Sequence, residues 1–515
     1  MRAHSERAKQ DGGSVCMETF PSVSGHSVRN LWIAAFTCIA LRLIAIWVIP
    51  PIYDEMVQLY MANDIGHLLR FPAYFDQQRY MGPFESYFLA PFLRIFGFSY
   101  LSGRLFNQIF YVGFIFLWVK ITRRFFSEKL TVPFLFVLAL LPSFALIFTA
   151  TVGFVEILFL ASLALWILLR ISETQKATGW SLALGFVCGL ALWTNPLFVV
   201  WAVPIASILA WVIPAGRKKN LLMFSAGVAL GLFPIGLDAL FNHEHLFLQG
   251  GGSRFSSLSE IPQMLYFYLS RMKTFFSVPP APDGIPFSAF MKTLSFIVLF
   301  VLMLPFGIFT FSSLRHIKDF NLQEKIFRLF VILPPFALCG FYVARNLVGD
   351  EGMRFFLPLV ISFPFCLAWW AGLPEKTIFR KTVLGVYLCM SFILMAVSLH
   401  VEYRETRKLM VIKDFLNEKN LRYGISEMTL SYPLHALSRG EIIVTPVHTQ
   451  ARNLAIWEQV REKGPQFFVA EHADQPAQRI LGNDSFLSKK NLGDYDVFYG
   501  KSPKLTTILD EGLKE

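Results

Sequence analysis

The chain has 515 residues, of which 54% are hydrophobic and only 16% are charged. Soluble domains carry about 25% charged residues, so this composition excludes a disordered chain, a coiled coil and a disulfide-rich secreted module, and argues against a single soluble globule. The net charge of +11 fits a nucleic-acid partner, an acidic membrane surface or a membrane topology. The position of the charge along the chain decides between these three.

Eleven apolar segments are long enough to cross a bilayer, which needs about 20 residues per helix. They are residues 31–50, 103–121, 131–149, 152–170, 179–194, 197–213, 221–241, 289–311, 327–344, 355–373 and 380–399. Asn195-Pro196 predicts a turn between two of them, and residues 83–98 predict either an interfacial helix or a twelfth span. The first segment is too long for a signal-peptide core and no small-residue cleavage site follows it, so we expect a retained first helix. The expected fold is an all-α polytopic membrane protein with about 11–13 transmembrane helices.

The orientation follows from the basic residues between the predicted spans. Residues 1–30 and the loops on the same side hold 20 Lys and Arg against 8 acidic residues, whereas the rest of residues 1–400 holds 11 against 12. Residues 1–30 are therefore expected to form a cytoplasmic tail. An odd number of spans places residues 401–515 outside, so the positive charge reports membrane orientation.

Three substantial pieces are expected outside the transmembrane domain of residues 31–400. They are a first outer loop (51–102), a second outer loop (242–288) and residues 401–515. The last piece reads as a small α/β domain, with strands near 441–446 and 466–470 and helices near 405–420 and 450–463. It contains 16 basic and 16 acidic residues, so it offers no basic surface for nucleic acid. Five cysteines lie in predicted spans and Cys16 precedes them, which predicts no disulfide.

Charged residues gather at the outer ends of the predicted spans. Asp54 and Glu55 follow the first span, Glu85 ends the first outer loop, Glu156 lies four residues into the fourth span, and Arg354 opens the tenth. Because successive spans alternate in direction, all five are expected at the outer membrane level. There a carboxylate can accept a proton from an attacking hydroxyl, and an arginine can hold a phosphate leaving group.

Each of these residues also has a simpler interpretation. Asp54-Glu55 fits a solvated helix start, Arg354 fits a side chain that snorkels to the interface, and Glu156 fits a packing role. His243-Glu244-His245 differs from the HExxH spacing of zinc enzymes and lies on a predicted loop, which favours a solvated turn. Three acids close together would also suit a divalent cation.

Several motifs occur in order along the chain. They are Tyr53-Asp54-Glu55, the run from Tyr80 through Phe96-Gly97 to Arg104-Leu105, the span around Glu156, Trp193-Thr194-Asn195-Pro196, and Met353-Arg354-Phe355-Phe356-Leu357-Pro358. Together they resemble the polyprenyl-phosphate-sugar-dependent glycosyltransferases of the GT-C fold, which include protein O-mannosyltransferases and lipid A aminoarabinose transferases. The resemblance covers roughly residues 30–400, in the manner of uncharacterised bacterial members.

The resemblance implies roles for the candidate residues. Asp54 would be the catalytic base and Glu55 would assist it or bind substrate. The remaining substrate-binding residues would be Tyr80, Glu85, Glu156 and Arg354, with Arg354 on the donor phosphate. The family usually needs no tightly bound metal, and we expect none here.

The resemblance leaves the sugar and the acceptor open. No MIR-type region is present, and Met81-Gly82-Pro83 stands where the aminoarabinose enzymes have Glu-Lys-Pro. The expected partners are a polyprenyl-phosphate sugar donor, a lipid, glycan or protein acceptor, and membrane lipids, with no nucleic acid. The expected location is the bacterial inner membrane, with the C-terminal domain outside.

The predicted function is an inverting glycosyltransferase that moves a sugar from a polyprenyl-phosphate donor to a hydroxyl acceptor on the outer side of the membrane. Loop 242–288 would cover the site as a lid. Three alternatives stay open: a transporter or flippase of lipid-linked or small solutes, a non-catalytic scaffold subunit, and a ligase or polymerase that uses a diphosphate donor. A transporter would place its charges near the bilayer midplane, whereas here they gather at one face.

Overall fold

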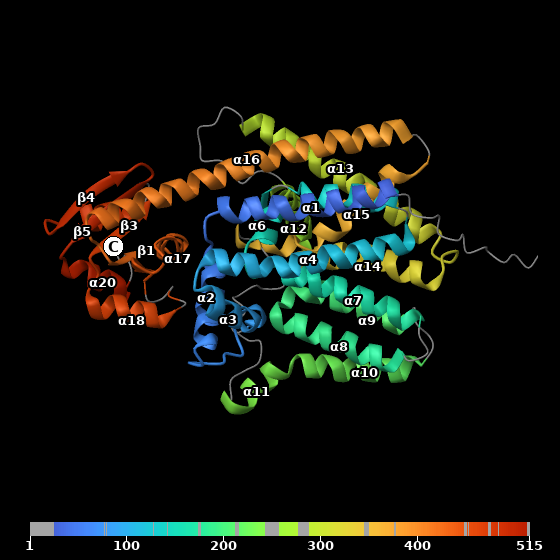
Figure 1. The fold of residues 1–515 in the computed structure, drawn as a ribbon, viewed down its shortest axis with the longest axis horizontal. Coiled ribbons are helices and arrows are strands. Elements are labelled where there is room, and N and C mark those ends of the chain that lie inside the picture. Colours follow the sequence, from blue (N-terminus) through green and yellow to red (C-terminus); the bar gives the residue numbers. More distant parts are fainter. Residues whose placement is uncertain are drawn as a thin grey trace, which may run out of the picture.

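The computed structural model describes residues 25–76, 78, 80–126, 128–141, 143–173, 177–211, 216–242, 257–276, 288–344, 350–374, 377–447, 451, 453–471, 475–482 and 484–511. Figure 1 shows a bundle of long helices and a small C-terminal α/β part, joined by one very long helix. Two short helices, α2 (Tyr53–Gly66) and α3 (Phe84–Phe96), lie at the end of the bundle that faces this part (Figure 1).

The chain is an integral membrane protein. Within the described residues, eight segments are long and apolar enough to cross a membrane, or up to ten if each of two bent helix pairs counts as one span. The eight are carried by α1 (Gly25–Val48), α4 (Tyr100–Phe125), α7 (Val155–Glu173), α8 (Ala177–Thr194), α13 (Ser288–Arg315), α14 (Leu322–Ala344), η3 (Asp350–Phe356) with α15 (Leu359–Gly372), and α16 (Thr377–Glu418).

The bent pairs and one short helix account for the rest of the predicted segments. The pairs are α5 (Glu128–Ala139) with α6 (Ser143–Ala150), and α10 (Arg217–Gly231) with α11 (Phe233–Asn242). The short apolar helix is η1 (Pro196–Phe198) with α9 (Val199–Trp211). All eleven predicted segments are thus helical, although three of them are bent or short.

The first outer loop is folded onto the bundle. It contains α2 and α3, and α3 has 13 residues, or about 20 Å at 1.5 Å per residue, which is too short to cross a bilayer. Residues 83–98 therefore form a short amphipathic helix and not a twelfth span. The second outer loop is described over η2 (Leu258–Glu260) and α12 (Ile261–Phe275), and α12 packs against η3.

A buried arginine closes the break between α5 and α6. Arg42 of α1 has no exposed surface and donates to the carbonyl oxygens of Leu138 and Ala139 at 2.9 and 2.8 Å, and to Thr149 Oγ1 at 2.9 Å. The last carbonyls of a helix have no partner inside that helix. The Arg42 guanidinium supplies hydrogen-bond donors for the carbonyls at the end of α5, where the side chain is buried.

The C-terminal part contains a five-stranded sheet. The strands are β1 (Tyr423–Ser426), β2 (Ile443–Thr445), β3 (Phe467–Glu471), β4 (Leu487–Leu492) and β5 (Tyr495–Gly500), in the order β2-β1-β3-β5-β4. β1 pairs in parallel with β2 and β3, and β5 pairs antiparallel with β3 and β4. Its helices are α17 (Met428–Leu437), α18 (Leu454–Lys463), α19 (Gln475–Gly482) and α20 (Pro503–Glu511). The predicted strands near 441–446 and 466–470 correspond to β2 and β3.

Helix α16 belongs to both parts of the molecule. It has 42 residues, and its last turns bury Leu409, Ile412 and Leu416 in the core beneath the sheet. The boundary expected between residues 400 and 401 lies inside this helix. The other connection is made by α17, whose Tyr432 ring lies 4.9 Å from that of Tyr53 at the start of α2. The C-terminal part therefore packs directly against the helix that carries Asp54.

Candidate active site

Asp54 and Arg354 meet although 300 residues separate them in the sequence. Arg354 Nη1 lies 3.1 Å from Asp54 Oδ2, and Arg354 Nη2 donates to the Tyr80 hydroxyl at 3.4 Å. The Tyr80 hydroxyl donates in turn to Gln78 Oε1 at 3.0 Å. The side chains of Asp54 and Arg354 stay 30% and 15% exposed. The pair is therefore within reach of a ligand.

Three separate elements bring these side chains together. Asp54 lies in the first turn of α2, Tyr80 in the segment between α2 and α3, and Arg354 on η3 just before α15. The backbone N–H of Ile52 donates to Glu55 Oε2 at 3.2 Å, which fixes the start of α2. These elements place three of the predicted site residues in one cluster.

The segment that carries Tyr80 is held by Trp193. The Trp193 Nε1–H donates to the carbonyl of Ala73 at 2.7 Å, and the Gly82 N–H donates to the Trp193 carbonyl at 2.6 Å. A Cβ at Gly82 would lie 2.2 Å from Trp193 Nε1, so no other residue fits there. The two motifs around Gly82 and Trp193 thus form one contact that fixes the first outer loop.

Glu55 points away from this cluster into the protein. Its carboxylate forms a bidentate ion pair with Arg104, with both N–O distances at 2.7 Å, and neither side chain has exposed surface. It also accepts from the N–H groups of Ile52 and Val152. All of its acceptor capacity is used, so Glu55 has no free oxygen for a substrate.

Arg104 is equally well satisfied. Besides Glu55, it donates to the carbonyls of Ile46, Ile49 and Pro50 at 2.7 to 2.9 Å, so each of its five N–H groups has an acceptor. These carbonyls end α1. The residue ties α1, α2 and α4 together next to the turn that carries Asp54.

Glu85 and Glu156 are also buried, but they lack such partners. Both Glu85 carboxylate oxygens and Oε2 of Glu156 have no hydrogen-bond partner among the described residues. Burial raises the pKa of Glu85 well above its ordinary value, and the charges of Glu156 and Glu55 raise it further. The acids predicted at one membrane level therefore do gather, although Glu85 and Glu156 lie inside the protein.

The sequence reasoning missed the role of Arg104. Its place in a motif assigns it no role, although a charged residue at the second position of an apolar segment is a signal of its own. The same signal marks Arg42. His243-Glu244-His245 lies outside the described residues, as does most of the expected lid. In the part that is described, no group of three or more His, Cys, Asp or Glu side chains is placed to hold a metal ion.

Comparisons with known proteins agree with this architecture. Residues 81–236 match the family model "Dolichyl-phosphate-mannose-protein mannosyltransferase". The crystal structure of ArnT from Cupriavidus metallidurans bound to undecaprenyl phosphate is similar with a TM-score of 0.59 and 12% identity, over 94% of this chain and 99% of that one. The chain has the GT-C fold. The predicted resemblance is thereby confirmed.

Two further structures share the GT-C fold. ArnT from the same organism in the apo state has a TM-score of 0.54 at 12% identity, over 91% of this chain and 97% of that one. The apo oligosaccharyltransferase from Archaeoglobus fulgidus has a TM-score of 0.50 at 13% identity, over 88% of this chain and 70% of that one. A comparison with curated protein sequences gives no significant match. Identities this low establish the fold of the chain and leave its substrates open.

Proposed function

We propose that the protein is an inverting glycosyltransferase that takes a sugar from a polyprenyl-phosphate donor and passes it to a hydroxyl acceptor. The observation that carries the proposal is the contact between Asp54 and Arg354 at 3.1 Å. It places a carboxylate beside the guanidinium that would hold the leaving phosphate. The family model and the GT-C fold support the same reaction class.

The proposed reaction is a single displacement. The acceptor oxygen attacks the anomeric carbon from the face opposite the phosphate, and its proton passes to Asp54. The bond between the anomeric carbon and the phosphate oxygen breaks with its electron pair, and Arg354 offsets the charge that develops on the phosphate. Because one displacement occurs, the configuration at the anomeric carbon inverts.

Donor binding would free the base. Without ligand, Asp54 and Arg354 neutralise each other. The phosphate of the bound sugar donor accepts hydrogen bonds from Arg354 and so competes with Asp54 for the same N–H groups. The phosphate carries more charge and more acceptor oxygens than the Asp54 carboxylate. Asp54 is then available to the acceptor hydroxyl only when the sugar donor is bound. Proton abstraction would therefore occur only in the donor-bound enzyme.

The remaining candidates take supporting roles in this proposal. Glu55 positions Asp54 by anchoring the start of α2 to Arg104, since its carboxylate is fully engaged there. Tyr80 orients the Arg354 guanidinium. Glu85 and Glu156 are buried inside the protein, where they would support the site without contacting the substrate. The membrane would be a bacterial inner membrane, with the site and the C-terminal part on its outer side, as the basic loops indicate.

The direct test is reconstitution of the full-length protein with defined donors. Proteoliposomes are given a polyprenyl-monophosphate sugar, the corresponding polyprenyl-diphosphate sugar, or no donor, together with cell-envelope lipids as acceptors. Mass spectrometry should find sugar transfer that depends on the monophosphate donor. Transfer from the diphosphate alone would support the ligase alternative, and solute movement without any donor would support the transporter.

A further inference from the structure

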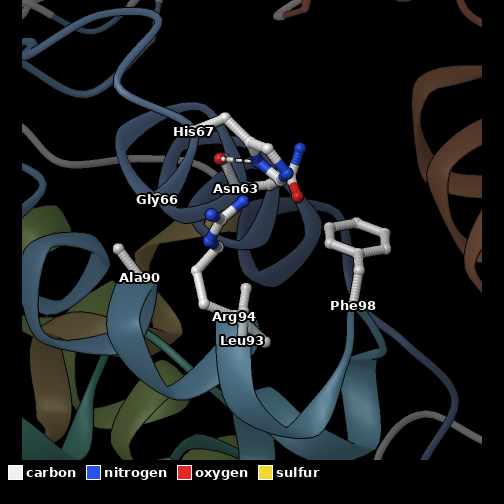
Figure 2. Close-up of a pocket in the computed structure, with 7 residues that line it drawn as sticks. All are labelled: Asn63, Gly66, His67, Ala90, Leu93, Arg94 and Phe98. Atoms are coloured by element: carbon white, nitrogen blue, oxygen red, sulfur yellow. Dashed lines mark hydrogen bonds between the residues drawn. The ribbon is translucent and has the colours of Figure 1, made fainter.

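A separate pocket lies at the far end of α2. It is a cavity of about 200 Å³ lined by Asn63, Gly66, His67, Ala90, Leu93, Arg94 and Phe98. Figure 2 shows Arg94 rising from α3 toward Asn63 and His67 at the end of α2. Asp54 and His67 are separated by roughly 20 Å at 1.5 Å per residue of helix, so the pocket does not belong to the site described above.

Arg94 is an unneutralised cation in this pocket. Its guanidinium has no hydrogen bond or ion pair with any residue that the structure describes, and the same is true of the Asn63 side-chain amide. The acid next to Asn63 is not available to Arg94, because Asp64 is paired with Arg70 at 2.8 Å. Arg70 also holds Asp76 at 2.6 Å. The pocket therefore offers hydrogen-bond donors and a net positive charge.

The stem of Arg94 is held in place. It passes over Gly66, where a Cβ would lie 3.2 Å from Arg94 Cγ and 3.2 Å from the Ala90 carbonyl oxygen. His67 is fixed by a hydrogen bond between Nδ1 and the Asn63 carbonyl at 2.8 Å (Figure 2). Because Nδ1 donates to this carbonyl, Nε2 of the neutral ring is an acceptor, so His67 lines the pocket without adding a donor for an anion.

Large exposed apolar side chains directly follow two of the residues that line this pocket. Leu68 and Leu69 directly follow His67 and are 74% and 72% exposed, and Ile95 and Phe96 directly follow Arg94 and are 76% and 64% exposed. Leu68 also has a positive φ of 58°, a conformation that is costly for leucine. Exposed apolar groups next to a free cation suit an amphiphile. Its acyl chains can contact the apolar groups, and its anionic headgroup can bind the cation.

We infer that this pocket binds the anionic headgroup of a membrane lipid, with the headgroup oxyanion on Arg94 and Asn63 and the acyl chains against Leu68, Leu69, Ile95 and Phe96. The location supports a lipid as occupant, since α2 and α3, which carry the pocket, lie together at one end of the bundle of apolar helices (Figure 1). The site is independent of the transfer reaction. It would anchor the helix that carries Asp54 to the lipid surface.

Lipid retention in native mass spectrometry tests the inference. The full-length protein is reconstituted in nanodiscs of phosphatidylcholine and phosphatidylglycerol, released, and its retained lipids are counted. The wild type should retain phosphatidylglycerol preferentially. Arg94→Gln should lower this retention roughly tenfold, because a charge-assisted hydrogen bond is lost. Arg407→Gln, which removes an exposed cation on α16, should change nothing. Equal retention by Arg94→Gln and the wild type would overturn the inference.

Two further arms separate a lipid from a free anion. Leu68→Asn removes an apolar side chain and suits the positive φ, so it should lower lipid retention without loss of thermal stability. Excess inorganic phosphate should not displace the retained lipid. Retention that is unchanged in Leu68→Asn, or displacement by phosphate alone, would assign the pocket to a free oxyanion and overturn the lipid headgroup.

Discussion

Asp54 and Glu55 are neighbours on one helix, and each faces an arginine, yet their surroundings are opposite. The Glu55–Arg104 pair has no exposed surface, and all five N–H groups of Arg104 have acceptors. The Asp54–Arg354 pair is partly exposed, and only two hydrogen bonds of Arg354 are described, to Asp54 and to Tyr80. Every hydrogen-bonding group of the Glu55–Arg104 pair is satisfied, whereas the Asp54–Arg354 pair can still form hydrogen bonds to a ligand.

This difference separates a structural role from a chemical one. A buried ion pair with every partner satisfied cannot exchange them without a large cost in free energy. A partly exposed pair costs less to open than a fully buried one, since water reaches the groups that separate. The residue that can exchange its partner is the one suited to bind substrate. Four variants test whether the comparison holds.

Asp54→Asn should have the largest effect. Loss of a general base lowers the rate roughly 10²- to 10⁴-fold, while the free energy of unfolding should change by less than about 1 kcal/mol. Turnover with the lipid-phosphate donor and thermal unfolding in detergent measure the two effects. Asp64→Asn on the same helix is the matched control and should keep its activity. An active Asp54→Asn enzyme would show that Asp54 is not the catalytic base.

Glu55→Gln should act mainly on stability. It leaves Arg104 buried without its counter-charge, which costs about 3–5 kcal/mol. Thermal unfolding and size-exclusion profiles in detergent should show a destabilised protein. The double variant Glu55→Gln/Arg104→Met should not restore stability, because the carbonyls that end α1 would lose their donors. A stable Glu55→Gln protein without turnover would instead give Glu55 a direct part in the chemistry.

Arg354→Lys should reduce turnover roughly 10- to 100-fold. Lysine keeps the positive charge but lacks the planar fork that holds a phosphate through two N–H groups, and a hydrogen bond to a charged group is worth about 1.5–3 kcal/mol. The loss should appear mainly in kcat, because the charge on the phosphate grows during the reaction. Wild-type kcat in Arg354→Lys would argue against the phosphate role.

Glu85→Gln should have the smallest effect, on the pH dependence of stability. Burial raises the pKa of Glu85, so above its ordinary value near 4.5 the unfolded chain releases a proton that the folded protein retains. The wild type should therefore lose stability as the pH rises, by at most about 1.4 kcal/mol per pH unit. Unfolding midpoints from pH 4 to 8 should show a flatter profile for Glu85→Gln, and exposed Glu458→Gln should resemble the wild type. Parallel profiles for Glu85→Gln and the wild type would contradict the burial of a protonated carboxyl group.

Much of the fold could be read from hydropathy. Each predicted apolar segment is helical, because a bilayer leaves a chain few other ways to satisfy its backbone. The limits of this reading were the bends and short helices, such as α5 with α6. There a distant side chain, Arg42, supplies the partners that the interrupted helix lacks, and no local pattern announces it.

The sequence by itself determined the residue types and the loops in which positive charge gathers, and it predicted a common membrane level for the candidate residues, because each depends on local composition and on the alternation of spans. Only the family resemblance favoured Asp54 over Glu55 as the base, since both occupy the first turn of one helix. Only the tertiary structure decided that Arg354 meets the first and Arg104 the second. That choice depends on the direction in which two successive side chains leave a helix, and on elements that return from 49 and 300 residues away.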